Sequence, residues 1–364
     1  MSTIFFTGFP GFLGRELLPR VLARSTSTRA VCLVQEKFRK VAEDAVASLE
    51  RADETLRGRI ELVAGDLTAR DLGLGDRRDA IAREVREIYH LAAVYDLAVP
   101  REVGMAINVE GTRHLLDFAK RCDRLERHQY VSTCYVSGKY PGIFREQDLE
   151  VGQSFNNYYE ETKYLAEVLV RDAAEAGMPT TVYRPAIVVG DSKTGATQKY
   201  DGPYFVIRYL LKQPEGFAVA PLAGDPHRTR LNVVPRDYVV DAIAYLSGEA
   251  KSLGKTYQLA APRPATIADL VQRIGEATGR RLVTVRLPPD FARWALSNVK
   301  PVRRFLDMPG ELVAYFVHPT FYTTHVAEED LAGTGIAPTP LEDMLPQMVE
   351  FVKAHPEISS NAMI

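Results

Sequence analysis

A tyrosine and a lysine four residues apart form the feature of this sequence with the clearest chemical use. They are Tyr159 and Lys163, and the adjoining Tyr158 and Tyr164 do not share that spacing. On a helix, residues i and i+4 lie on one face, so the lysine ammonium would lie beside the phenol. A nearby positive charge favours the phenolate and lowers the phenol pKa from its reference value of about 10. We therefore expect Tyr159 to serve as a proton donor near neutral pH.

A cluster of hydroxyl groups follows the fifth expected strand, residues 128–132. Thr133 would stand at the carboxyl end of that strand, where ligands of open α/β sheets bind. Its hydroxyl could hold a carbonyl oxygen beside the tyrosine. Ser132 and Ser137 fit equally well as side chains that bond the backbone of a turn. Thr133 therefore joins the tyrosine and the lysine as the expected catalytic set.

Three glycines at intervals of three lie between a short apolar run and an amphipathic segment. They follow the expected strand 3–7 and lead into the expected helix 14–23. Without side chains, the backbone can turn sharply and approach a pyrophosphate, and the helix N-terminus offers free N–H groups to the phosphates. The alternative is a plain strand-to-helix turn with small residues. We expect a dinucleotide to contact this turn at Gly8, Phe9, Pro10, Gly11, Phe12, Leu13 and Gly14.

The residues after the second expected strand bear on the choice between NAD and NADP. Glu36 could hold the ribose diol of NAD, whereas Lys37, Arg39 and Lys40 could accept the 2′-phosphate of NADP. The balance of charge favours NADPH, with NAD as one alternative and simple solvation of the next helix as another. Further cofactor contacts are expected at the ends of the next two strands, through Asp66, Leu67, Leu91, Ala92 and Ala93.

Short apolar runs alternate with longer amphipathic segments through the first half of the chain. The expected strands are 3–7, 30–34, 60–64, 87–91, 128–132, 180–189 and 257–259, and the expected helices are 14–23, 38–51, 78–86, 109–121 and 158–176. Such alternation implies an α/β fold with a Rossmann-type doubly wound parallel sheet. Residues 1–189 with 232–260 are assigned to this dinucleotide-binding domain, 190–231 and 261–357 to a smaller, mostly helical substrate domain, and 358–364 to a tail.

The composition favours an ordinary globular protein that acts on small molecules. The 45 basic and 47 acidic residues leave a formal charge of −2, which argues against a nucleic-acid partner. The three cysteines are widely spaced and show no zinc-site pattern, so we expect a reducing compartment and no metal. The sequence shows neither signal-peptide features nor a run of about 18 apolar residues, so we expect a cytoplasmic protein without a transmembrane segment.

Taken together, the motifs resemble those of the extended short-chain dehydrogenase/reductase family. TGFPGFLG, GDL, HLAA, NVEGT, VSTCYVSG, YYEETK and YRPAIVVG occur in that family's order across roughly residues 2–260. The resemblance implies that Thr133, Tyr159 and Lys163 are catalytic, and that Asn108 helps to place the lysine. It also implies that the nicotinamide lies against Pro185, Ala186, Ile187 and Val188.

Within that family, the sequence is most similar to fatty acyl-CoA reductases and to the thioester reductase domains of carboxylic acid reductases and peptide synthetases. The similarity rests on Thr133 at the catalytic place and on VGDSKTG at 189–195 followed by DGPY at 201–204. One departure is Gln35, because this branch usually has an arginine there that binds the 2′-phosphate. Gln35 remains an expected cofactor contact, and NADP and NAD both stay open.

The resemblance implies hydride transfer to the carbonyl of a hydrophobic substrate, an acyl thioester on coenzyme A or on a carrier protein, which would give an aldehyde. A ketone or hydroxysteroid-type dehydrogenase is the main alternative, followed by a nucleotide-sugar epimerase or dehydratase and a non-catalytic NADP-binding protein. We expect a monomer or homodimer. Aromatic residues of the substrate domain should either wall the substrate or form that domain's core: Tyr204, Phe205, Tyr209, Phe217, Trp294, Phe305, Tyr315 and Phe316.

Overall fold

Seven parallel strands form the central sheet of the computed structural model, which describes residues 2–95, 99–299 and 310–358. Their order from edge to edge is β11 (Thr256–Leu259), β7 (Thr180–Pro185), β5 (Arg127–Val131), β4 (Val85–His90), β1 (Ser2–Thr7), β2 (Thr28–Val34) and β3 (Ile60–Ala64). The order runs outward from β1 in both directions, so the strand order reverses between β1 and β4. Open α/β sheets bind their ligands in the crevice at such a point. The expected doubly wound sheet is therefore confirmed.

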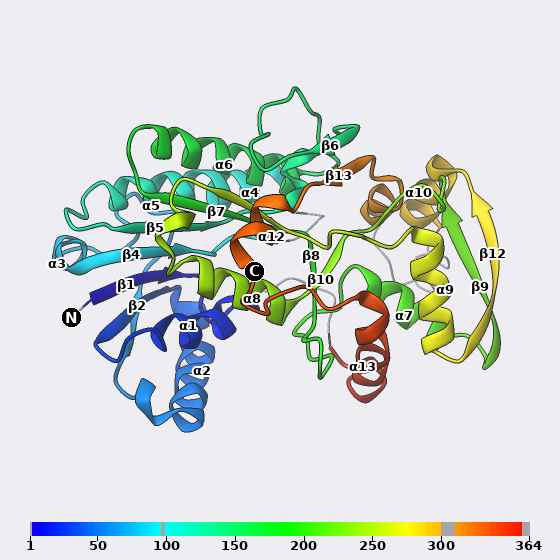
Figure 1. Cartoon of the computed structure of the whole chain (residues 1–364), viewed down its shortest axis with the longest axis horizontal. Helices are drawn as coiled ribbons and strands as arrows, with labels where there is room; N and C mark the ends of the chain where they lie inside the picture. The colour runs from blue at the N-terminus through cyan, green and yellow to red at the C-terminus, as the bar shows by residue number, and fades with distance from the viewer. Residues whose placement is uncertain (1, 96–98, 300–309, 359–364) are drawn as a thin grey trace.

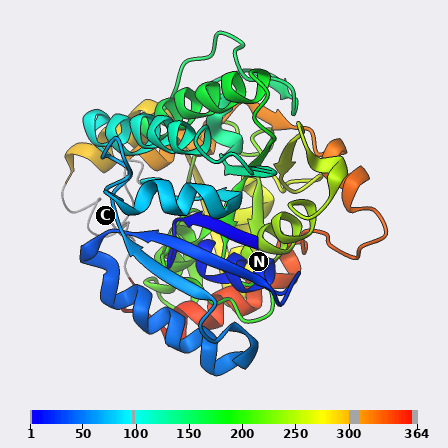
Figure 2. The ribbon, with the colours of Figure 1, turned by 90° about the vertical axis from the view of Figure 1, so that its left-hand side faces the viewer.

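Helices cover both faces of the sheet, as the two views in Figures 1 and 2 show. On one face lie α1 (Gly14–Leu22), α2 (Arg39–Ala52) and α8 (Arg236–Leu246), and on the other lie α3 (Arg77–Glu84), α5 (Gly111–Ala119) and α6 (Tyr158–Glu175). Strands covered on both faces read as continuous apolar runs rather than as alternating ones. β1 follows this rule, because Ile4, Phe5 and Phe6 are all fully buried.

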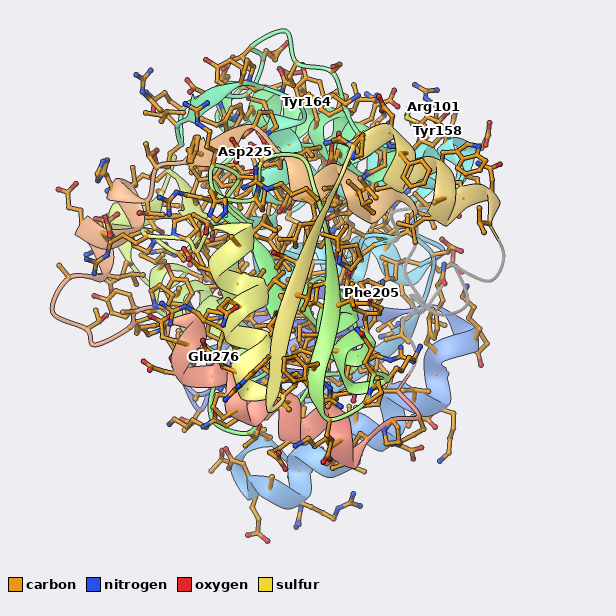
Figure 3. All side chains as sticks on the ribbon, turned by 90° about the vertical axis from the view of Figure 1, so that its right-hand side faces the viewer. Arg101, Tyr158, Tyr164, Phe205, Asp225 and Glu276 are labelled. Atoms are coloured by element: carbon orange, nitrogen blue, oxygen red, sulfur yellow. The ribbon has the colours of Figure 1, made fainter. Side chains whose placement is uncertain are left out.

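A second, smaller core lies beside the sheet, on the right in Figure 1. It is built by α7 (Pro203–Leu211), β9 (Gly216–Ala223), α9 (Ile267–Ala277), β12 (Arg280–Leu287) and α13 (Leu341–Ala354). β9 and β12 pair in parallel, with Val219 opposite Val283, and Figure 3 shows the pair beside α9, which carries Glu276. The helix α10 (Pro289–Asn298) and the 3₁₀ segment η6 (Gly310–Val317) pack together at the end of β9. This region is therefore helical with one pair of strands.

Short elements connect the sheet to the second core. β8 (Ile187–Val189) pairs with β10 (Val233–Pro235), and β6 (Gly142–Phe144) pairs with β13 (Thr320–Tyr322). The helix α12 (His325–Leu331) packs on β11 and α8, so this late part of the chain returns to the core of the sheet. The division into two domains stays a prediction. The remaining helical turns are η1 (Glu36–Phe38), η2 (Glu54–Leu56), α4 (Arg101–Gly104), η3 (Met105–Glu110), η4 (Cys134–Ser137) and η5 (Ala250–Ser252).

Three further observations concern the described residues alone. None of their helices is long and apolar enough to cross a membrane. They contain no group of three or more side chains that could hold a metal ion. Cys32, Cys122 and Cys134 are buried and free. The cytoplasmic location stays a prediction.

Candidate active site

A cavity of about 470 Å³ opens at the carboxyl ends of β1, β2, β4, β5 and β7. Its walls include most of the expected cofactor residues: Gly8, Phe9, Pro10, Gly11, Phe12, Leu13, Gly14, Gln35, Lys37, Asp66, Leu67, Leu91, Ala92, Ala93, Pro185, Ala186, Ile187 and Val188. Thr133, Tyr159 and Lys163 line the same cavity. Motifs that are far apart in the sequence therefore meet in a single hollow at the crevice of the sheet.

The turn after β1 leaves no room for side chains. Gly8 has a φ of +89°, a left-handed conformation that favours glycine, and a Cβ there would lie 2.8 Å from the Ala92 nitrogen. The Gly11 N–H donates to the Gly8 carbonyl oxygen at 2.9 Å, and a Cβ on Gly11 or Gly14 would collide with that oxygen. The bare backbone at the start of α1 can therefore approach a phosphate closely. This cradle fits the expected dinucleotide.

An amide, a carboxylate and a cation line the part of the cavity after β2 and β3. Gln35 Nε2 donates to Asp66 Oδ2 at 3.0 Å, and Lys37 lines the same wall. Burial tends to raise the pKa of Asp66, but hydrogen bonds from Thr68 and Gln35 outweigh it, and the pKa lies below its usual value. Asp66 is therefore an anion that can accept a hydrogen bond from a ligand.

Arg39 does not line this cavity as the described residues form it, and its contact with the cofactor stays a prediction. It is the first residue of α2, and its Nε donates to Glu43 Oε1 at 3.0 Å, one turn further on. Lys40 pairs in the same way with Asp44 at 2.9 Å. Both side chains follow the helix surface to a carboxylate four residues away, as i,i+4 pairs do. Of the three basic side chains at positions 37, 39 and 40, that of Lys37 lines the cavity.

Tyr159 lies at the second position of α6 and is 8% exposed. Burial raises the pKa of its phenol above the usual value, and a hydrogen bond with Thr133 opposes this shift. The expectation that Lys163 lowers this pKa is therefore wrong, because desolvation dominates. The phenol stays protonated near neutral pH, and it can donate its proton to an oxygen held by Thr133.

Lys163 turns its ammonium toward the end of β5. Its Nζ donates to the Tyr130 hydroxyl at 3.0 Å and to the Val131 carbonyl oxygen at 2.9 Å. The same atom lies 4.5 Å from the centroid of the Tyr130 ring. Burial lowers the pKa of Lys163 to about 7, and the carboxylate of Glu167 opposes this shift. The charge of this ammonium therefore changes close to neutral pH.

Asn108 lies in the π-helical segment η3 and is 2% exposed. Its Oδ1 accepts from the Val94 N–H at 2.8 Å, and its Nδ2 donates to Thr162 Oγ1 at 3.0 Å. Asn108 therefore joins the segment after β4 to the residue that precedes Lys163 on α6. Its role in placing the lysine stays a prediction, and the observed contacts would act through Thr162.

Several cavity residues near Tyr159 were not singled out from the sequence. The Tyr95 ring lies edge-on to the Tyr159 ring, with centroids 4.9 Å apart, and Lys199 Nζ lies 4.7 Å from the Tyr95 ring. Lys199 is also 3.9 Å from Asp201, and all of these residues line the cavity. Tyr95 follows the HLAA motif by two residues. Its position just after an expected strand, where ligands of such sheets bind, could have identified it as a site residue. Lys199 lies in an irregular segment that gives no such signal.

Of the aromatic residues expected in the substrate domain, Tyr315 lines the cavity. Its ring lies 4.8 Å from that of Tyr135, and Asn157 Nδ2 donates to its hydroxyl at 3.3 Å. Phe305 lies outside the described residues. The others pack in or on the second core (Tyr204, Phe205, Tyr209 and Phe316) or are exposed (Phe217 and Trp294). The frequency of aromatic residues in this region left wall and core as alternatives, and it did not predict which residues face the cavity.

A comparison with protein families matches residues 6–243 to the NAD-binding family described as Male sterility protein. The matched range contains the glycine-rich turn together with Thr133, Tyr159 and Lys163. This chain belongs to that family. Membership of the Male sterility protein family confirms the relationship to extended short-chain dehydrogenase/reductases, and it supports a nicotinamide cofactor.

Relatives of this Male sterility protein family member include much longer proteins. A linear gramicidin synthase protein of Brevibacillus parabrevis is 31% identical over 284 residues, which are 74% of this chain and 5% of that protein. The carboxylic acid reductase of Mycobacterium tuberculosis is 27% identical over 325 residues, which are 81% of this chain and 28% of that protein. The chain therefore spans a small part of the length of the curated relatives that it matches.

A solved structure matches almost the whole chain. The terminal R domain of the myxalamid PKS-NRPS biosynthetic pathway is 28% identical, with a TM-score of 0.80, and the match covers 99% of this chain and 92% of that one. The Male sterility protein family fold seen here is thus the fold of a terminal R domain. Together with the reductases among the relatives, this likeness places the chain among NAD(P)-dependent oxidoreductases.

Proposed function

We propose that this chain reduces the thioester of a hydrophobic acyl substrate to an aldehyde, uses NADPH as the reductant and releases a free thiol. One observation carries the proposal: Thr133, Tyr159 and Lys163 line the same cavity as the glycine-rich turn. The carboxylic acid reductase among the relatives and the solved terminal R domain support reduction of an acyl group.

The residues around the substrate oxygen would control its protonation. The nicotinamide, when bound, supplies a hydride to the carbonyl carbon. The Thr133 hydroxyl and the Tyr159 phenol donate hydrogen bonds to the carbonyl oxygen and stabilise the negative charge that develops on it. Tyr159 then transfers its proton to this oxygen, which gives a hemithioacetal. When the carbon–sulfur bond breaks, the hydroxyl proton passes to sulfur, and the products are an aldehyde and a thiol.

NADPH is the proposed reductant because of the charge near Gln35. Lys37 lines the cavity there, whereas Glu36 is not among the described lining residues. A lysine can balance the 2′-phosphate of NADPH, and a carboxylate in the lining would have favoured the ribose diol of NADH. Lys37 would thereby take the part of the arginine that this chain lacks at position 35.

The rest of the cavity suits an acyl chain. Val94, Tyr95, Ile107, Tyr135 and Tyr315 give it apolar and aromatic walls, which bury a hydrophobic ligand. The thioester would reach the site on coenzyme A or on the phosphopantetheine arm of a carrier protein. A carrier protein is therefore a proposed partner, and the oligomeric state, monomer or homodimer, stays a prediction.

An assay of two products tests the proposal. Purified protein is incubated with NADPH and dodecanoyl-CoA, and NADPH consumption is compared with the thiol that is released. Equal amounts of oxidised cofactor and free thiol, with dodecanal as the product, are the expected result. Turnover of a hydrophobic ketone such as 2-dodecanone, with none of the acyl-CoA, would overturn it in favour of a ketone dehydrogenase.

A further inference from the structure

A fully buried ion pair lies behind the catalytic residues. Glu167, one turn after Lys163 on α6, and Arg184, near the end of β7, have no exposed side-chain surface. Arg184 Nη2 donates to Glu167 Oε1 at 2.7 Å, and its Nε donates to the same oxygen at 3.0 Å. Burial alone would raise the pKa of Glu167, but Arg184 outweighs it, and the carboxylate is charged. Desolvation offsets much of the attraction in such pairs, whereas removal of one partner leaves the other charge buried without compensation.

Both members of the pair adjoin the cavity wall. The Ser132 hydroxyl donates to Glu167 Oε2, and the residue after Ser132 is Thr133. Arg184 precedes Pro185, whose carbonyl oxygen accepts from the Thr133 hydroxyl at 3.4 Å. The Glu167 carboxylate therefore ties the ends of β5 and β7 to α6 at the level of Thr133.

The described titratable side chains near Lys163 are uncharged at neutral pH, except for the carboxylate of Glu167. Tyr130 from β5 is held protonated by burial, which raises its pKa, and His90 from β4 is neutral because burial lowers its pKa well below the usual value. Tyr159 on α6 is also protonated, since burial raises its pKa. Among these described neighbours of Lys163, the Glu167 carboxylate alone favours the ammonium, against the desolvation that disfavours it.

Arg184 has partners other than Glu167. Its Nη2 donates to the Asp148 carbonyl oxygen at 2.7 Å. Arg171 reaches the same loop, where it donates to the Gln147 carbonyl oxygen at 2.8 Å, and its Nε lies 3.4 Å from Glu167 Oε1. A neutral side chain of the same shape at position 167 would therefore leave the guanidinium of Arg184 bonded to the protein.

We propose that Glu167 is a positioning residue of the active site, which fixes Thr133 through Ser132 and places a negative charge one helical turn from Lys163, where it favours the ammonium. This role of Glu167 rests on the proposed function, because it concerns the placing of Thr133 and the charge of Lys163 in the same carbonyl-reducing site. Glu167 itself does not line the cavity formed by the described residues, so it acts through its neighbours.

The substitution Glu167→Gln tests the charge. Glutamine keeps an acceptor for the Ser132 hydroxyl and removes the negative charge, so the pKa of Lys163 should fall. The Lys163 side-chain signal, identified by its absence in Lys163→Met, is followed by NMR across pH in the protein without substrate. We expect its titration midpoint to move to lower pH; a move of about one unit takes the charged fraction at pH 7 from about one half to about one tenth, so kcat at neutral pH should fall about fivefold. KM and NADPH affinity should not change.

The substitution Ser132→Ala tests the link to Thr133. It removes one hydroxyl and leaves the ion pair intact, so the protein should fold even if Glu167→Gln does not. A displaced Thr133 would lower kcat by about tenfold or more, because misplacement by an ångström costs on the order of 10²-fold. Ser132→Thr restores a hydroxyl and should recover most of kcat. A kcat that stays unchanged in Ser132→Ala overturns the positioning role.

A buried carboxylate that does not line the cavity of the described residues provides the matched control. Asp330 accepts from Tyr257 at 2.6 Å and from Lys255 at 2.7 Å, beside β11. Asp330→Asn should lower the melting temperature without moving the Lys163 titration. If Glu167→Gln does the same and no more, Glu167 is only a structural brace, and the proposal fails. The NMR titration needs no substrate, so failure of the wild-type protein to reduce any thioester would count against the proposed function and not against this result.

Discussion

The two halves of the cavity are built from different kinds of chain segment. The proposed cofactor half consists of the turn Gly8–Gly14, of Gln35 and Asp66 just after β2 and β3, and of Lys37 in the short segment η1. The substrate half consists of Tyr95, Tyr135, Lys199, Asp201 and Tyr315, which come from loops and from the 3₁₀ segments η4 and η6. The first half presents backbone in a fixed turn, and the second presents side chains whose position depends on distant packing. Under the proposed function, recognition of the cofactor would depend on local structure, and recognition of the substrate would depend on the packing of the whole fold.

The largest effect is expected at Tyr159, where the two halves meet. Tyr159→Phe removes the proton donor and keeps the ring that packs on Tyr95. We expect kcat to fall by about 10²–10⁴-fold, the usual contribution of a positioned proton donor, with NADPH affinity unchanged. Single-turnover NADPH oxidation and a fluorescence titration with NADPH measure the two quantities. Tyr158→Phe is the control, since Tyr158 is 48% exposed and does not line the cavity in the part of the chain described. Equal activity in the two variants would remove Tyr159 from the mechanism.

The next largest effect should come from the backbone of the cofactor half. In Gly8→Ala, a Cβ would be placed 2.8 Å from the Ala92 nitrogen in a left-handed conformation. We expect NADPH affinity to fall by more than about tenfold, together with a loss of about 1–2 kcal/mol of unfolding free energy from the conformation alone. Gly58→Ala is the matched control, because Gly58 has a φ of +70° and nothing within 4 Å of its Cβ position. Gly58→Ala should lower the unfolding free energy and leave NADPH affinity unchanged. A similar loss of NADPH affinity in both variants would contradict a phosphate site at the turn Gly8–Gly14.

The same contrast explains what could be predicted from the sequence. The strands of the central sheet and the glycine turn depend on local spacing, and the structure has them close to the expected ranges, except that the expected strand 180–189 is divided into β7 and β8. Tyr159 and Lys163 line one cavity, but the Lys163 ammonium bonds Tyr130 and Val131. Arg39 is outside the cavity wall of the described residues because its side chain pairs with Glu43 on its own helix, and this pairing was not foreseen from the sequence. The pKa of Tyr159 was predicted in the wrong direction, because spacing reveals a charge nearby and does not reveal burial.

The substrate half was harder to predict, for a physical reason. Aromatic side chains are buried as readily in a domain core as in the wall of a pocket. Tyr204 and Phe205 lie in the second core, whereas Tyr315 faces the cavity. Glu167 also escaped notice. Its spacing from Lys163 is visible in the sequence, but its partner Arg184 lies 17 residues further on and meets it only when β7 joins the sheet.

A smaller effect is expected from Lys37, the cation of the cofactor half. Lys37→Ala should weaken NADPH binding by about tenfold, close to 1.4 kcal/mol, and leave NADH binding unchanged, because only NADPH carries a 2′-phosphate. Lys40→Ala should change neither, since Lys40 pairs with Asp44 on the exposed surface of α2. The preference for NADPH over NADH in steady-state kinetics provides the measurement. A loss of both cofactors in Lys37→Ala would assign this lysine to the shared part of the dinucleotide.

The smallest effect is expected in the substrate half, at Tyr315. Tyr315→Leu keeps an apolar side chain but removes the ring that packs on Tyr135 and the hydroxyl that accepts from Asn157. We expect KM for dodecanoyl-CoA to rise by roughly three- to tenfold, since an aromatic contact contributes about 0.5–1.5 kcal/mol beyond its buried area. NADPH affinity should be unchanged, whereas Phe217→Leu, at a side chain 66% exposed, should alter neither quantity. If Tyr315→Leu instead weakens NADPH and spares KM, the two halves of the cavity are not separate, because a residue of the second core would then be holding the cofactor.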